Sequence, residues 1–141
     1  MPAIPLPCMC ASFRRAARAL TQFYDDALRP LGLRVTQFTI LQALSLAGEI
    51  SQGDLGRLLV IDSTTLTRTL RLMRPWIEER PGRDRRERWL RLSALGRRQL
   101  ERATGPWQKV QARLRAHFGA GRWAELQKAA TEISSIIAKP E

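Results

Sequence analysis

A run of hydroxyl side chains and arginines between residues 62 and 74 has the composition of a helix face that contacts DNA bases. Asp62 is a good N-cap, and the apolar residues after it, Leu66, Leu70 and Met73, repeat every three or four positions. This pattern predicts a helix from 63 to about 74 with these three residues buried. Short hydroxyls can approach base edges and thymine methyl groups, and Arg68 can donate two hydrogen bonds to guanine. The alternative is a solvated helix cap with ordinary surface arginines. The residues that face outward or flank the outward side are Ser63, Thr64, Thr65, Thr67, Arg68 and Arg71.

An arginine-rich segment follows this helix, with six arginines in residues 80–91. Strand-like runs at 76–79 and 87–92 enclose a Pro-Gly tip, which predicts a β-hairpin. An arginine gains from the negative potential of a narrow A·T-rich minor groove, and Asp84 could hold the guanidinium of Arg86 in position. The alternative is a solvated charged hairpin. The candidate DNA-contacting residues of this loop are Arg83, Asp84, Arg85 and Arg86.

A helix start precedes both segments. Residues 51–54 (Ser-Gln-Gly-Asp) resemble a capping box, which predicts a short helix to about residue 59. Because a helix N-terminus presents backbone N–H groups to an anion, Ser51 and Gln52 are candidate contacts for a DNA phosphate. Gln37, in a helix predicted over 36–47, is assigned to the same role. In order, these segments form the pattern of a winged helix-turn-helix.

The net charge of +11 and the sequence pI of about 11.4 favour a polyanion partner or an acidic membrane surface. Residues 57–102 hold thirteen arginines against six acids, a net charge of +7. This surplus coincides with the helix-turn-helix pattern, which favours nucleic acid over a merely solvated surface. No apolar run approaches the roughly 20 residues needed to cross a bilayer, and residues 1–13 make a poor signal peptide. The expected location is therefore the cytoplasm, with no membrane partner.

Longer helices must position these candidate sites. Amphipathic patterns predict a helix over 11–28, a long one capped by Ser93 and a last one from about Gly121. The 141 residues fit one mainly α domain: a winged helix-turn-helix over 34–96 with a small β-hairpin wing, and terminal helices within 1–30 and 97–141. The apolar stripes of these terminal helices pack either within one chain or around a two-fold axis. We favour dimerisation, because a monomer would expose much apolar surface.

A two-fold dimer would also suit DNA. It would place two reading helices roughly 34 Å apart, which is one turn of the duplex, so that both could enter successive major grooves. The expected operator is therefore pseudo-palindromic double-stranded DNA.

The order and spacing of these residues resemble the MarR family of bacterial transcriptional regulators over about residues 9–138. The resemblance implies a homodimer built from the first, fifth and sixth helices, with the fourth helix in the major groove. It also implies a minor-groove arginine, matching Arg86 and held by Asp84. It further implies autoregulated repression, relieved by a small anionic or phenolic ligand or by thiol oxidation. The segments that carry it are Leu31–Phe38, Ser51–Leu55, Asp62–Arg68, Asp84–Arg86, Leu92–Ser93 and Gly96.

Two cysteines lie near the N-terminus, Cys8 and Cys10, too close for an ordinary stapling disulfide. Cys10 precedes Tyr24 by fourteen residues, a spacing similar to the organic-peroxide-sensing branch of the family. Cys10, Cys8 and Tyr24 are therefore the candidate redox sensor, although two further tyrosines of that branch are Arg14 and Val35 here. The alternatives are an idle cysteine pair and a metal site.

A metal site is the weaker of these alternatives, because two thiolates need further ligands and the sole histidine, His117, is distant. No histidine or acid is arranged to activate a thiol nucleophile, so we predict neither an enzyme nor a bound metal or cofactor. The predicted function is sequence-specific binding of double-stranded DNA by a homodimeric repressor that is released by a small-molecule ligand or by thiol oxidation. The alternative is a non-specific architectural protein that binds DNA or RNA through the same charge.

One segment departs from the family pattern. The usual glycine turn between the reading helix and the wing is Arg74-Pro75-Trp76 here, and the junction is about two residues short. This departure predicts a wing with a different tilt.

Overall fold

The computed structural model describes residues 2–138, with side chains as far as residue 136. The predicted mainly α winged helix-turn-helix is confirmed, and residues 1 and 139–141 of the predicted domain lie outside the described residues. The helices are α1 (Met9–Leu28), α2 (Val35–Ala47), α3 (Gln52–Leu59), α4 (Ser63–Leu72), α5 (Ala94–Phe118) and α6 (Ala120–Ala138). The strands are β1 (Ile50–Ser51), β2 (Ile77–Pro81) and β3 (Arg88–Leu92), and the short 3-10 helices are η1 (Arg29–Leu31) and η2 (Arg74–Trp76).

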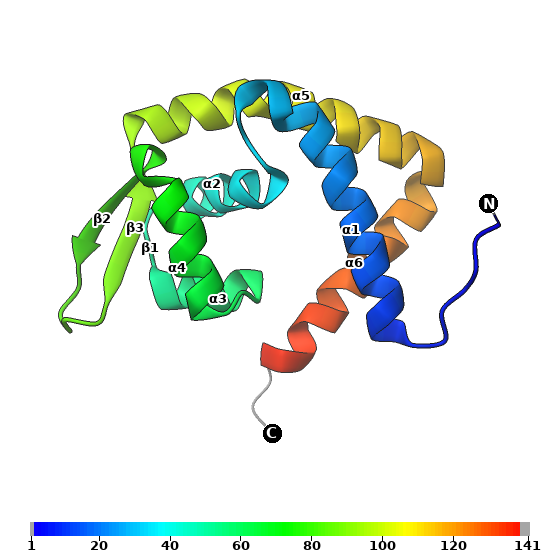
Figure 1. Cartoon of the computed structure of the whole chain (residues 1–141), viewed down its shortest axis with the longest axis horizontal. Coiled ribbons are helices and arrows are strands. Elements are labelled where there is room, and N and C mark those ends of the chain that lie inside the picture. The colour runs from blue at the N-terminus through cyan, green and yellow to red at the C-terminus, as the bar shows by residue number, and fades with distance from the viewer. Residues whose placement is uncertain (1, 139–141) are drawn as a thin grey trace.

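The long helix α5 joins two parts of the molecule (Figure 1). The helices α2, α3 and α4 gather with the sheet near its N-terminal end, while α1 and α6 lie near its other end. The helix contacts α1, α2, η2 and α6, so it is the element that relates the helix-turn-helix to the terminal helices.

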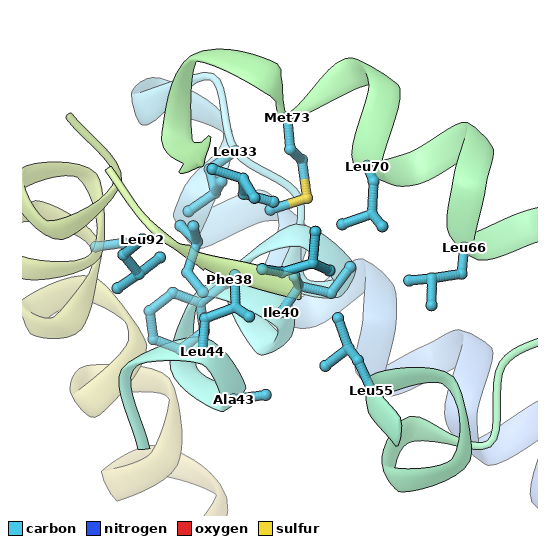
Figure 2. Packing of buried hydrophobic residues seen from close by; sticks show 14 of the residues in the cluster. Leu33, Phe38, Ile40, Ala43, Leu44, Leu55, Leu66, Leu70, Met73 and Leu92 are labelled. Atoms are coloured by element: carbon cyan, nitrogen blue, oxygen red, sulfur yellow. The ribbon is translucent and has the colours of Figure 1, made fainter. Parts of the chain in front are cut away.

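The core lies between α2, α3, α4 and β3. Figure 2 shows Leu66, Leu70 and Met73 directed from the α4 segment into the cluster that Phe38 and Leu55 also enter. Leu66, Leu70 and Met73 are at most 4% exposed, so the predicted inward face is confirmed. This packing turns the opposite face of α4 to the solvent.

Side-chain caps set where these helices begin. The Ser51 hydroxyl accepts the Asp54 N–H at 3.1 Å, and the Asp62 carboxylate accepts the Thr65 N–H at 2.9 Å. Ser93 caps α5 in the same way, at 3.0 Å. All three predicted caps are confirmed, with one difference: the Asp54 carboxylate accepts from the Ser51 hydroxyl, at 2.9 Å, instead of from its backbone N–H.

The sheet has one more strand than the sequence predicted. Its order is β1-β3-β2, with Ile50 opposite Leu90 in one antiparallel pair and Ile77 opposite Leu92 in the other. The hairpin was predicted, but its strands are 77–81 and 88–92 instead of 76–79 and 87–92. The strand β1 was missed because two residues are too few to show an alternating pattern.

The short junction between α4 and the wing forms η2, in which the Trp76 N–H donates to the Met73 carbonyl at 2.9 Å. Ser93 fastens this turn to the start of α5: its N–H donates to the Trp76 carbonyl at 2.9 Å and its hydroxyl to the Pro75 carbonyl at 2.7 Å. A Cβ at Gly96 would overlap the Trp76 carbonyl oxygen. The close contact between η2, at the base of the wing, and α5 therefore requires glycine at position 96.

Replacing Gly96 with alanine should lower the free energy of unfolding by roughly 1–3 kcal/mol, because the added methyl forces η2 away from α5. Gly53→Ala is the matched control, because a Cβ there meets only the end of the flexible Arg57 side chain, at 3.8 Å. Its stability should be unchanged or slightly raised. Chemical denaturation of both variants checks this, and equal stabilities would contradict the assigned role of Gly96.

Candidate nucleic-acid interface

The outward face of α4 is as predicted in exposure. The six residues Ser63, Thr64, Thr65, Thr67, Arg68 and Arg71 are all exposed. Two of their hydroxyls are already engaged, however. The Thr65 hydroxyl lies 2.6 Å from the Asp62 carboxylate, and that contact, with the Thr65 N–H, lowers the pKa of Asp62 from its ordinary value. The Thr67 hydroxyl accepts from the Gln52 amide at 3.0 Å. Thr65 and Thr67 thus help to fix the helix itself.

Ser51 and Gln52, at the start of α3, were both predicted to contact phosphate, but their side chains differ in exposure and in partners. Ser51 is only 6% exposed, and its hydroxyl is used by Asp54 in the cap, so its side chain is not accessible to a phosphate in this arrangement. Gln52 is half-buried and ties α3 to Thr67 of α4. The Gln52 side chain therefore holds the two helices of the helix-turn-helix together, a link that the sequence did not indicate.

A groove of about 1310 Å³ brings the wing and the head of α4 together. Ser63 of α4, Gln52 of α3 and Arg86 of the wing line it, with Asp84 and Arg88 beside Arg86. Ser63 and Arg86, which are 23 positions apart in the chain, thus face one hollow, and Ser134 of α6 also lines it.

The wing tip is a tight loop. The Gly82 N–H donates to the Glu87 carbonyl at 2.9 Å, and the Glu87 N–H donates to the Asp84 carbonyl at 3.0 Å. We expected the Asp84 carboxylate to hold the Arg86 guanidinium; instead it accepts the Arg86 backbone N–H, at 3.2 Å. A short acidic side chain reaches the backbone two residues ahead more readily than the end of a long side chain. Asp84 therefore sets the turn, and Arg83, Arg85 and Arg86 are exposed on it.

The base of the wing holds arginines of a different kind. The Arg80 guanidinium binds both carboxylate oxygens of Glu49, in the turn before β1, and lies 5.2 Å from the centre of the Trp89 ring. This hydrogen bonding lowers the pKa of Glu49 and raises that of Arg80. Arg91 pairs with Glu78 across the hairpin at 2.7 Å. Sequence reasoning missed Glu49 because it lies 31 residues from Arg80.

The start of α2 depends on α1. The Val35 N–H donates to the Asp25 carboxylate of α1 at 2.7 Å, and the Arg34 N–H donates to the Gln37 side-chain oxygen at 3.0 Å. Gln37 is half-buried, and its side-chain NH₂ is the group left to meet a phosphate. Asp25, Arg34 and Gln37 line a second hollow, of about 430 Å³, together with Arg29.

The cysteines lie at the exposed start of α1. Cys8 is its N-cap residue and Cys10 is in its first turn; both thiols are exposed and free. Tyr24 lies fourteen residues further along the same helix, about 21 Å at ~1.5 Å per residue, so it does not contact Cys10 of its own chain. The Tyr24 hydroxyl donates instead to the side-chain oxygen of Gln111 in α5, and burial raises the Tyr24 pKa.

Among the described residues, no group of three or more histidine, cysteine, aspartate or glutamate side chains is placed to hold a metal ion. None of the helices in the described part of the chain is both long and apolar enough to cross a membrane.

The whole arrangement matches known regulators. MosR of M. tuberculosis, a transcriptional regulator solved in complex with DNA, is 36% identical to this chain; the match has a TM-score of 0.83 and covers 93% of this chain and 96% of MosR. This chain belongs to the MarR family of bacterial winged helix-turn-helix transcriptional regulators. Another MosR structure gives 34% identity and a TM-score of 0.80, over 94% of this chain and 96% of that one. No protein-family model matches the chain.

More distant relatives agree with the MarR-family assignment. An uncharacterized HTH-type transcriptional regulator of Bacillus subtilis, YwoH, is 26% identical over 106 residues, which are 74% of this chain and 77% of YwoH. A mutant of E. coli MarR, complexed with operator DNA, has a TM-score of 0.77 at 22% identity, over 89% of this chain and 92% of MarR. At that identity the likeness shows the fold shared within the MarR family.

The contact between Glu49 and Arg80 predicts a pH dependence. Because the folded pKa of Glu49 is below its ordinary value of 4.5, the contact stabilises the fold above about pH 4.5 and is lost as pH falls through the lowered pKa. Glu49→Gln should therefore melt at a lower temperature than the wild type at pH 7, and the difference should shrink below pH 4.5. Thermal melts from pH 7 to pH 3 check this.

Glu79→Gln is the control for this prediction, because Glu79 is an exposed carboxylate on β2 of the same hairpin. A Glu49→Gln deficit that stayed constant across the pH range would exclude the ion pair as the cause.

Proposed function

We propose that this chain binds double-stranded DNA sequence-specifically as a homodimeric transcriptional repressor. The observation that carries the proposal is the shared groove, in which Ser63 at the head of α4 and Arg86 of the wing face the same hollow. A major-groove helix and a minor-groove loop must approach one duplex from one side, and these two elements meet that requirement.

The helix α4 is proposed to read bases in the major groove. Ser63 and Thr64 lie in its first turn, and Arg68 and Arg71 are exposed further along. Hydroxyls at the head of the helix can accept or donate at base edges, and Arg68 can bind guanine through two N–H groups. Gln52 supports this role by fixing α4 through Thr67, and the first turn of α3 offers its backbone N–H groups to a phosphate. The side-chain NH₂ of Gln37 is proposed as a second phosphate donor.

The wing is proposed to enter the minor groove. Arg86 is its leading residue, because it is exposed, lines the groove and follows the turn that Asp84 fixes. Arg83 and Arg85 flank it and are proposed to contact phosphates. Arg80 has no such role, because Glu49 and Trp89 hold its guanidinium at the base of the hairpin.

A second copy of the chain is proposed to cover the terminal helices. Among the residues of α1 only Leu28 is buried, and none of the described side chains of α6 is. Exposed apolar faces of this extent on two helices are typical of an interface. The exposed large apolar residues are Met9, Phe13 and Leu20 on α1 and Leu126, Ile133 and Ile136 on α6.

Release from DNA is proposed to follow an effector or oxidation. A peroxide would oxidise the Cys10 thiol to a sulfenic acid and would itself be reduced to water or an alcohol. The sulfenic acid would add a polar group next to Met9, whose side chain is exposed. A small anionic or phenolic effector would find Arg29 and Arg34 around the hollow between α1 and α2. NadR, whose structure holds 4-hydroxyphenylacetate, shares this fold at 21% identity, with a TM-score of 0.76 over 96% of this chain and 99% of NadR.

The experiment that tests this function is a selection from a random DNA library with purified protein, followed by titration of the selected and a scrambled duplex at several salt concentrations. We expect a pseudo-palindrome whose half-sites lie about one turn apart. Equal affinity for both duplexes at every salt concentration would favour the non-specific architectural alternative, which the charge of +11 also fits. Repeating the selection after oxidant treatment tests the thiol.

Arg86→Ala should weaken binding of the selected duplex roughly tenfold, with the largest loss at A·T-rich flanks, because the narrow minor groove there attracts a guanidinium most strongly. Arg98→Ala removes an equal charge from an exposed position on α5 and is the control. Fluorescence anisotropy measures both. Equal losses in the two variants would assign Arg86 a general charge effect only.

Leu20→Glu should produce a monomer with much weaker DNA binding, because a carboxylate replaces an apolar side chain in the proposed interface of α1. Leu46→Glu on α2 is the matched control, since Leu46 is 90% exposed and lies outside the terminal helices. Analytical ultracentrifugation reports the mass of each. A dimer that survived Leu20→Glu would remove the central part of α1 from the interface.

A further inference from the structure

One residue of the helix-turn-helix has a strained backbone. Val60, which ends α3, has φ 54° and ψ 47°, and it is the one non-glycine residue with positive φ in the described chain. In this left-handed region the Cβ of an L-residue crowds the following carbonyl oxygen, so glycine is the usual choice at such a helix end. A β-branched side chain makes the conformation still less favourable.

The packing explains why the backbone adopts a left-handed turn at this position, but not why the residue there is valine. The Ile61 N–H donates to the Gly56 carbonyl at 2.9 Å, and Leu59 and Ile61 pack against the core on either side of Val60. These neighbours force the left-handed turn. The Val60 side chain is 50% exposed, so burial in the free protein does not offset the strain, and glycine would satisfy the same backbone.

Val60 lies where the proposed DNA interface begins. It lines the groove that Ser63 and Arg86 also line, and it precedes the N-cap of α4 by two residues. The same lining holds the charged or hydroxyl side chains of Arg57, Asp62 and Ser63 and the apolar side chains of Ile61 and Leu66. Because Leu66 is buried, Val60 is the more exposed of Val60 and Leu66, and it lies among charged and hydroxyl side chains of the groove lining.

We propose that Val60 is a specificity-determining residue that packs against the 5-methyl group of a thymine in each half-site. The thymine methyl is the apolar feature of the major-groove edge, and a short branched side chain at the head of the reading helix suits it. DNA binding covers the Val60 methyl groups, and this burial offsets the backbone strain that the free protein carries. The inference rests on the proposed function, because it presumes that α4 enters the major groove.

The test replaces each thymine of the selected duplex with deoxyuridine, one at a time, which removes only the 5-methyl group. Wild-type protein should lose about three- to tenfold in affinity at one position of each half-site. Val60→Gly should bind the unmodified duplex more weakly by a similar factor and should be indifferent to deoxyuridine at that position. This combination is a double-mutant cycle between one side chain and one methyl group.

The melting temperatures of variants distinguish a role of Val60 in DNA binding from a purely structural role. Val60→Gly should melt no lower than the wild type, because glycine adopts the left-handed conformation without strain, although its DNA binding is weaker. Val60→Ala keeps the strained conformation without the branched side chain, so it should share the DNA-binding defect and melt below Val60→Gly. Leu58→Ala is the control: Leu58 is an exposed apolar residue of α3 outside the groove lining, and its deoxyuridine profile should match the wild type.

Two results would overturn this inference but leave the proposed function intact. In the first, Val60→Gly binds the duplex with wild-type affinity. In the second, Val60→Gly binds all duplexes more weakly with an unchanged deoxyuridine profile, which would mean that Val60 contacts the sugar-phosphate backbone of the DNA. A wild-type protein that prefers no duplex would overturn the proposed function and this inference together, and it would be recognised before any variant is made.

Discussion

The contact between the Trp76 carbonyl and Gly96 is the constraint on which the rest of the arrangement depends. Only Met73 and η2 separate the end of α4 from β2, so the chain has little length with which to vary the angle between α4 and the wing. Ser93 holds η2 through two hydrogen bonds and at the same time caps α5. The position of the wing, the end of α4 and the direction of α5 are therefore set at one joint.

The arginines of the wing divide by position into two groups. At the base, Arg80 and Arg91 are paired with Glu49 and Glu78, and their charge is used to hold the hairpin and the turn before β1 together. At the tip, hydrogen bonds along the backbone from Gly82 to Glu87 make the turn, so the exposed arginine side chains there are not needed to maintain it. A loop that is shaped by its backbone can present charge to a ligand without losing its own structure when that charge is neutralised.

Local patterns in the sequence predicted the features that one helix or one cap determines. The inward face of α4 followed from its helical period, and the caps by Ser51, Asp62 and Ser93 followed from residue type and position. Contacts between distant segments were not predicted, because they depend on how the elements pack.

The Asp25 cap on α2, the link from Gln52 to Thr67 and the pair of Glu49 with Arg80 are of this distant kind. The predicted contact of Asp84 was wrong: its carboxylate accepts the Arg86 backbone N–H and does not hold the Arg86 guanidinium. The strain at Val60 could not be seen in the sequence either, since no residue type there marks a left-handed turn.

The single helix α5 also has a mechanical consequence. Its 25 residues form one continuous helix, with Pro106 inside it, about 37 Å long at ~1.5 Å per residue. A pivot of about 10° near Gln111, where Tyr24 of α1 contacts α5, would carry the N-terminal end of α5, about 26 Å away at ~1.5 Å per residue, by roughly 4–5 Å, more than one base-pair step of a duplex. Under the proposed function, a small chemical event among the terminal helices would therefore be amplified by this leverage into a mismatch of register with DNA, without any change inside the helix-turn-helix.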